Sequence, residues 1–121
     1  MKRLISPHVD IYKFPITAIS SITTRITGLG LTGYFVLGGI SGFNNHKYLK
    51  QKYDQLGKVE KNIVNYLVVF PGVYHTCGGI RHFVWDKFPH LMTNKKVALS
   101  SYVLFGLSTM ITILSEKALI N

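Results

Sequence analysis

The chain has 121 residues, enough for one domain, and its single cysteine, Cys77, excludes an internal disulfide and an all-cysteine metal site. It carries 14 Lys and Arg against 5 Asp and Glu, which gives a formal net charge of +9, yet 47% of its residues are hydrophobic. The basic residues are scattered between apolar runs and form no stripe with interleaved aromatics, which argues against nucleic-acid binding and favours contact with a membrane surface and with acidic partner subunits.

Three runs without Asp, Glu, Lys or Arg divide the chain, and they contain 21, 19 and 19 residues in chain order. A helix rises by about 1.5 Å per residue, so each run is long enough to cross the hydrocarbon core of a bilayer. We therefore predict an all-α membrane protein that forms a single domain over residues 1–121. Its three transmembrane helices are expected over about residues 21–43, 62–85 and 97–115.

Polar segments precede and separate the first two spans. Residues 1–19 form a basic lead-in whose prolines disfavour helix, so we expect this segment to extend along the membrane surface. Residues 44–61 are rich in lysine and are expected to form a solvated linker, with a short helix over about residues 47–56.

The three spans differ in composition. The first is rich in glycine and threonine, so its hydropathy signal is the weakest, and we expect its later glycines, Gly38, Gly39 and Gly42, to serve helix packing rather than the approach of a flat cofactor. The third span has Tyr102 as its only ionisable residue, and we expect it only to pack.

Three spans place the N-terminus and the second loop on one side of the membrane. That side carries eight Lys and Arg and the other carries six, a slight bias that predicts the N-terminus on the matrix or cytoplasmic side. The start of the first span and the end of the second share this level. Ser21 and Arg25 should therefore lie near Arg81, His82 and Asp86.

His75 lies six residues before Arg81, which is about 9 Å deeper in the membrane. An ionisable residue is costly at this depth and points to a function. An imidazole in an apolar bundle is a natural axial ligand for haem iron, and Gly78 and Gly79 would leave room for a porphyrin plane. The alternative is a histidine that only hydrogen-bonds to a neighbouring helix, and the spacing alone does not decide between the two.

The interfacial residues suggest chemistry that would accompany such a haem. Arg25, Arg81 and His82 are placed to neutralise haem propionates. Ser21 beside Arg25 is placed to hydrogen-bond a quinone carbonyl, and Asp86 is placed to relay protons. A second haem-ligating histidine would have to come from another chain, because the remaining histidines lie in loops or near the end of the same helix face. A small transporter is the least favoured interpretation, since the spans hold no Asp, Glu or Lys for a coupling ion.

Two motifs carry a family resemblance. The first, residues 21–28, is a Ser, three residues, an Arg and, three residues later, a Gly. The second, residues 74–86, follows the pattern Tyr-His-x-x-x-Gly-Ile-Arg-His-x-x-Trp-Asp. With Pro7-His8, Phe14-Pro15 and Phe70-Pro71, they resemble the cytochrome b large membrane-anchor subunits of succinate dehydrogenase, which is respiratory complex II. The resemblance covers about residues 6–86, and the third span matches only in length.

The resemblance implies roles for individual residues. His75 would be an axial ligand of haem b, and a small membrane-anchor subunit would supply the second ligand. The resemblance also implies that Ser21, Arg25 and Asp86 contact ubiquinone. It further implies that Arg81 and His82 contact the haem propionates.

The resemblance further implies partners and a location. An iron–sulfur subunit and a flavoprotein subunit would dock on the matrix or cytoplasmic face, and electrons would pass from succinate to ubiquinone. The location would be the mitochondrial inner membrane, with a bacterial plasma membrane as the alternative. One position departs from the pattern, because Thr24 stands where the family commonly has a His that serves the propionate or the quinone site. The alternative function is a purely structural anchor or assembly subunit without haem.

Overall fold

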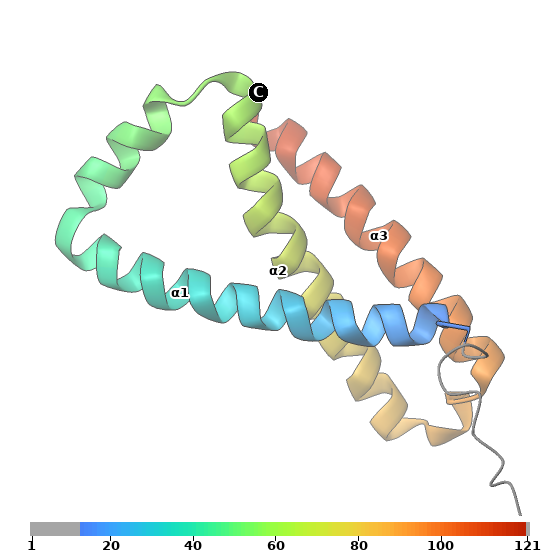
Figure 1. Ribbon diagram of the computed structural model, residues 1–121. Coiled ribbons are helices and arrows are strands. Elements are labelled where there is room, and N and C mark those ends of the chain that lie inside the picture. The colour runs from blue at the N-terminus through green and yellow to red at the C-terminus, as the bar shows by residue number, and fades with distance from the viewer. Residues whose placement is uncertain (1–12, 121) are drawn as a thin grey trace, which may run out of the picture.

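The computed structural model describes residues 13–120, and these residues form helices joined by short turns. In chain order the elements are α1 (Ile16–Gln55), α2 (Lys58–Lys87), the short 3-10 helix η2 (Pro89–Leu91) and α3 (Asn94–Ile120). α2 and α3 run side by side, and α1 crosses α2 obliquely (Figure 1). The extended lead-in was predicted over residues 1–19, and residues 1–12 of it lie outside the described residues. The prediction is wrong for residues 16–19, which form the first turn of α1 because Pro15 precedes the helix instead of interrupting it.

α1 consists of two helical parts that meet at a sharp bend. Pro15 has an extended backbone and precedes the first part, which is a position where the missing N–H of proline costs nothing. Asn45 has non-helical angles, with φ −148° and ψ 38°, and the parts Ile16–Gly42 and Asn45–Gln55 are inclined by 114°. The second part is the short helix that was predicted near residues 47–56. It is held to α2 by the Tyr53 hydroxyl, which donates to Asn65 Oδ1 at 2.9 Å.

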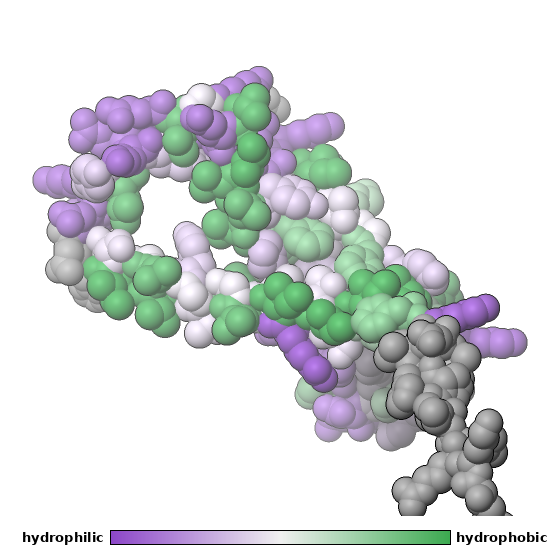
Figure 2. All heavy atoms as spheres, viewed as in Figure 1, coloured by the Kyte–Doolittle hydropathy of each residue, from purple (hydrophilic) through white to green (hydrophobic). Residues whose placement is uncertain are grey.

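The predicted all-helical membrane fold is confirmed, while the side of the N-terminus stays a prediction. Among the described residues, α2 and α3 are each long and apolar enough to cross a membrane, and a third span results when the two bent parts of α1 are taken together. The weaker signal of the first span agrees with its content of glycine and threonine. The predicted spans 62–85 and 97–115 lie inside α2 and α3, whose ends extend beyond them with polar residues. Figure 2 shows hydrophilic residues gathered over the bent part of α1 and the start of α2.

The three helices approach each other closely at a small residue. A Cβ atom on Gly78 would lie 3.3 Å from Thr24 Oγ1 of α1 and 4.0 Å from Leu104 Cδ2 of α3, so this glycine is the point where all three helices meet. In contrast, Gly38, Gly39 and Gly42 have no heavy atom within 4 Å of such a Cβ position. Within the described part of the chain these later glycines therefore pack against no other helix, because α1 diverges from α2 after the crossing (Figure 1), and their packing stays a prediction for contact with another chain.

A row of aromatic rings along α2 leads to a ring contact with α3. Tyr66, Phe70 and Tyr74 lie one turn apart on α2, with ring centroids 5.5 and 5.6 Å apart, and Tyr74 meets Phe105 of α3 at 4.9 Å. Tyr74 is fully buried, and its hydroxyl donates to the oxygens of Ser20 on α1 at 3.2 and 3.3 Å. A buried tyrosine usually needs such a partner for its hydroxyl.

Arg81 connects the three helices through hydrogen bonds. Its Nη2 donates to Ser20 Oγ of α1 at 3.0 Å, and its Nη1 donates to Ser101 Oγ of α3 at 3.0 Å. Its guanidinium also lies 4.6 Å from the centre of the Trp85 ring, where a cation is attracted by the negative face of the ring. Because Ser20 and Ser101 are fully buried, α3 does more than pack, and it contributes one of the polar contacts that fix the bundle.

We expect Ser101→Ala to destabilise the bundle by about 1–2 kcal/mol, because it leaves a charged N–H of Arg81 without its acceptor. The matched control is Ser100→Ala, since the Ser100 hydroxyl bonds only to its own helix at the Val97 carbonyl. Unfolding of the purified protein by titration with SDS in detergent micelles measures both effects. Equal stability of the two variants would contradict the role given to Arg81.

Candidate functional site

The His75 ring is oriented by a backbone carbonyl of another helix. Its Nδ1 lies 3.0 Å from the carbonyl oxygen of Thr24 on α1. A carbonyl oxygen only accepts, so Nδ1 is the donor in this contact, and in the neutral form of the ring Nε2 is then the nitrogen that carries the lone pair. The side chain is exposed on the surface of the chain. A neutral imidazole held in this way presents Nε2 as a ligand toward whatever lies outside the chain.

Gly28 makes this position of the ring possible. A Cβ atom on Gly28 would lie 2.7 Å from Cε1 and 3.1 Å from Nδ1 of His75, closer than such atoms approach in proteins. Thr24 and Gly28 are one helical turn apart, so both lie on the same face of α1 and contact the same ring. The first motif contains both Thr24 and Gly28, so its spacing hinted at the contact between α1 and His75. The motif does not reveal that His75 bonds to the backbone carbonyl of Thr24.

The second motif divides into two stripes along α2. We call the residues His75, Gly79, His82 and Asp86 the outer stripe, and all four are exposed. The residues one position earlier, Tyr74, Gly78, Arg81 and Trp85, form the inner stripe, and they are buried or half-buried. Each stripe repeats with the 4, 3 and 4 residue spacing that keeps side chains on one helix face.

Only one of the two glycines after His75 leaves open space. A Cβ atom on Gly79 would have no heavy atom within 4 Å, so a flat group can approach the backbone there, one turn from His75. Gly78 was expected to leave such room as well, and this expectation is wrong because Thr24 and Leu104 occupy the space.

The start of α1 lies at the same level as the end of α2, as predicted. The contact between Ser20 and Arg81 shows this directly. The sequence predicted a functional hydroxyl at Ser21. Its neighbour Ser20 is the serine that joins the buried hydrogen-bond network with Tyr74 and Arg81. Ser21 is half-buried and Arg25 is exposed, and in the described part of the chain neither side chain has a hydrogen bond to another described residue.

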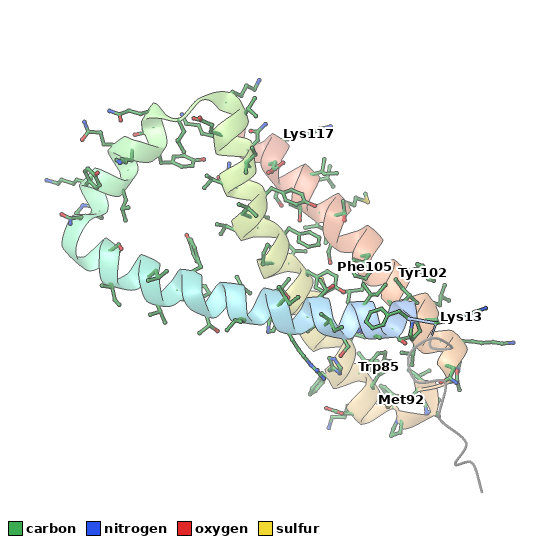
Figure 3. All side chains as sticks on the ribbon, viewed as in Figure 1. Lys13, Trp85, Met92, Tyr102, Phe105 and Lys117 are labelled. Carbon is green, nitrogen blue, oxygen red and sulfur yellow. The ribbon has the colours of Figure 1, made fainter. Side chains whose placement is uncertain are left out.

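The remaining predicted residues separate into different surroundings. His82 is exposed and meets the Trp85 ring edge-on at 5.3 Å between centroids, and Asp86 is exposed one turn further along the outer stripe. Arg81 instead points between the helices toward Ser20 and Ser101. Figure 3 shows Trp85 and Met92 at one end of the bundle and Lys117 at the opposite end, so these polar residues gather toward one membrane boundary.

Within the described residues, His75 is the histidine at membrane depth, and it is part of no complete metal site. Within residues 13–120 there is no group of three or more His, Cys, Asp or Glu side chains that is able to hold a metal ion. A metal bound by His75 would therefore need its other ligands from a macrocycle and from a second chain. His8, one of the histidines predicted to lie in loops, is outside the described residues.

Comparison with known proteins places these observations in a family. The sequence matches the family described as succinate dehydrogenase/fumarate reductase transmembrane subunit over residues 1–115. It is 36% identical to the mitochondrial succinate dehydrogenase cytochrome b560 subunit of Dictyostelium discoideum over an alignment of 124 positions. This alignment covers 93% of this chain and 62% of that protein. The Homo sapiens subunit of the same name is 36% identical over 120 residues, covering 89% of this chain and 71% of that protein.

The succinate dehydrogenase cytochrome b560 subunit of Reclinomonas americana is 32% identical over an alignment of 126 positions, which covers 95% of this chain and 85% of that protein. The chain thus spans about three fifths of the length of the Dictyostelium relative. The mitochondrial relatives and the apolar helices indicate a multi-pass protein of the mitochondrial inner membrane, as predicted. With two motif stripes on α2, a start of α1 that meets the end of α2, and a match over nearly its whole length, the chain belongs to the family of succinate dehydrogenase/fumarate reductase transmembrane subunits.

Proposed function

We propose that this chain is a membrane-anchor subunit of a succinate:ubiquinone oxidoreductase, in which it supplies one axial ligand of haem b and part of the ubiquinone-reducing site. The observation that carries the proposal is the His75 side chain, whose Nδ1 is held by the Thr24 carbonyl of another helix while the residue stays exposed. A histidine that served only to link two helices would have no need for an exposed ring beside an open glycine.

The residues around His75 suit a haem. The hydrogen bond from Nδ1 to Thr24 fixes the tautomer and makes Nε2 a better electron donor, as found for metal-bound histidines generally. Gly79 leaves space for the edge of a macrocycle one turn away. A bound haem b would supply a one-electron redox centre near the quinone site. The second axial ligand is proposed to come from the small membrane-anchor subunit, because His82 lies on the same helix face two turns further on.

The propionate contacts are proposed for His82 and Arg81. The exposed His82 side chain is the more accessible of the two to a bound haem. His82 belongs to the outer stripe with His75, whereas Arg81 already donates to two buried serines. Thr24, which replaces the family's usual histidine, bonds through its hydroxyl to the Ser20 carbonyl at 3.0 Å and packs against Gly78. Its side chain is thus used for helix contact, and we assign it no propionate contact.

The quinone contacts are proposed for Ser21, Arg25 and Asp86. Ser21 and Arg25 are one turn apart and share a face of α1, so a hydroxyl and a guanidinium are offered together at the membrane boundary. The hydroxyl would donate to a quinone carbonyl oxygen and the guanidinium would stabilise negative charge that develops on it. Asp86, exposed at the end of the outer stripe, would pass protons from water to the quinone.

The partners are proposed from the same arrangement. The outer stripe faces the small anchor subunit, and the polar end that carries Ser21 and Asp86 faces an iron–sulfur subunit, to which a flavoprotein subunit is attached. Both extramembrane subunits would deliver electrons from succinate, because this chain has neither a dinucleotide-binding fingerprint nor a cysteine cluster.

We expect His75→Ala to remove most of the b-type haem absorbance from the purified complex, because one of the two axial bonds is lost. The control is His90→Ala, which removes a histidine from η2 without touching the outer stripe. Absorbance spectra of the reduced complex, scaled to protein content, measure the haem. Normal haem content in the His75 variant would refute the ligand assignment and favour a purely structural anchor.

We expect Gly28→Ala to lower haem content while Gly30→Ala leaves it unchanged. The added methyl group at residue 28 collides with the His75 ring and displaces it from the Thr24 carbonyl, whereas residue 30 has open space around it. The same spectra provide the measurement. If both substitutions behave alike, the contact between α1 and the ring has no part in holding haem.

We expect Ser21→Ala and Arg25→Ala each to lower kcat/KM for ubiquinone reduction about tenfold or more, since each removes a group aimed at the quinone oxygen. Ser41→Ala is the control, because it makes the same change at the far end of the first part of α1. Succinate-dependent reduction of a soluble ubiquinone analogue measures the effect, and reduction of an artificial dye shows whether the succinate-oxidising subunits still work. Full quinone reductase activity in both variants would point to an assembly role.

A further inference from the structure

A groove between α2 and α3 shares only Arg81 with the proposed site. It has a volume of about 460 Å³, and its walls come from these two helices alone, on a side that α1 does not cover. The wall from α3 is strongly apolar and exposed, with Leu99, Val103 and Leu107 at 65%, 56% and 46% exposure. Cys77 and Ile80 of α2 form the opposite wall.

The groove has a charged end and an apolar end. Lys96 lies at the start of α3, and Arg81 and Ser100 lie further in, while Leu107 marks the deep end. In the part of the chain that the structure describes, no carboxylate lies within ion-pair distance of Lys96 or Arg81. The Nε atom of Arg81 is buried and has no acceptor among these residues. Positive charge at a membrane boundary without an anion of its own attracts one from outside.

The length of the groove distinguishes between two kinds of occupant. Lys96 and Leu107 are eleven residues apart, which corresponds to about 16 Å along a helix. This is close to the depth of one leaflet, since the whole hydrocarbon core measures about 30 Å. A transmembrane helix of a partner would cover both leaflets, whereas a lipid acyl chain covers one and places its phosphate at the boundary.

We propose that this groove binds an anionic phospholipid, with one acyl chain along Leu99, Val103 and Leu107 and the phosphate at Lys96. The proposal rests on insertion of the chain in a membrane and does not depend on haem or quinone. Such a lipid would complete the surface between α2 and α3 next to Arg81, and would make the anchoring of these helices sensitive to the charge of the leaflet.

The test uses the assembled complex, purified in neutral detergent and incubated with equal concentrations of dioleoylphosphatidylglycerol and dioleoylphosphatidylcholine. Native mass spectrometry counts the lipids that each variant retains. Lys96→Gln should lower retention of phosphatidylglycerol about fivefold, as expected for one lysine near an anionic surface. Lys95→Gln is the matched control, because this neighbouring lysine is exposed but does not line the groove. Equal retention in the two variants would overturn the proposal.

A second variant tests the apolar part of the groove. Val103→Trp fills it and should lower retention of both lipids, and SDS titration of the same variant shows that the bundle remains folded. Unchanged retention of both lipids by the folded variant would overturn the proposal. A photo-crosslinking residue at position 99 separates the two occupants. Attachment to phosphatidylglycerol supports the lipid, and attachment to a helix of a partner subunit shows that the groove is a protein interface.

Discussion

A cation that lies between packed helices has to find hydrogen bonds within the protein, and Arg81 finds two of them by contacting both neighbouring helices. Its bonds to Ser20 and Ser101 fix how far each helix is shifted along its axis relative to α2. The position of Ser20 in turn determines where the next turn of α1 lies, and this turn contains Thr24 and Gly28. The orientation of His75 therefore depends on a residue six positions away that does not touch it.

The motif on α2, residues 74–86, combines two tasks on adjacent faces of one helix. The inner stripe builds the bundle through an aromatic ring, a glycine contact and the guanidinium. The outer stripe, displaced by a single residue, leaves its polar groups available to other molecules. A motif of this kind tolerates few changes, because most positions serve either assembly or the site.

The helices and their approximate limits could be predicted from hydropathy and charge, since the interval between charged residues sets the length of a span. The shared level of the start of α1 and the end of α2 followed from topology alone. The roles within the site were harder to foresee. Nothing in the sequence distinguishes Ser20 from Ser21, or Gly78 from Gly79, because the difference is a rotation of about 100° around a helix axis. The partner of His75 is a main-chain carbonyl, which every residue possesses, so residue types could not reveal it.

Beyond the point where α1 crosses α2 the two helices diverge, and this divergence affects the stability of the chain. Gly30, Gly33, Gly38, Gly39 and Gly42 all face open space, and Figure 2 shows an opening between this part of α1 and α2. A glycine-rich helix gains little from lipid alone and depends on close contact with other helices. Among the described residues, no other helix supplies such contact to this half of α1. If a second chain covers it in the membrane, folding and that contact become one linked equilibrium, in which copies without the second chain would be less stable and more open to proteolysis.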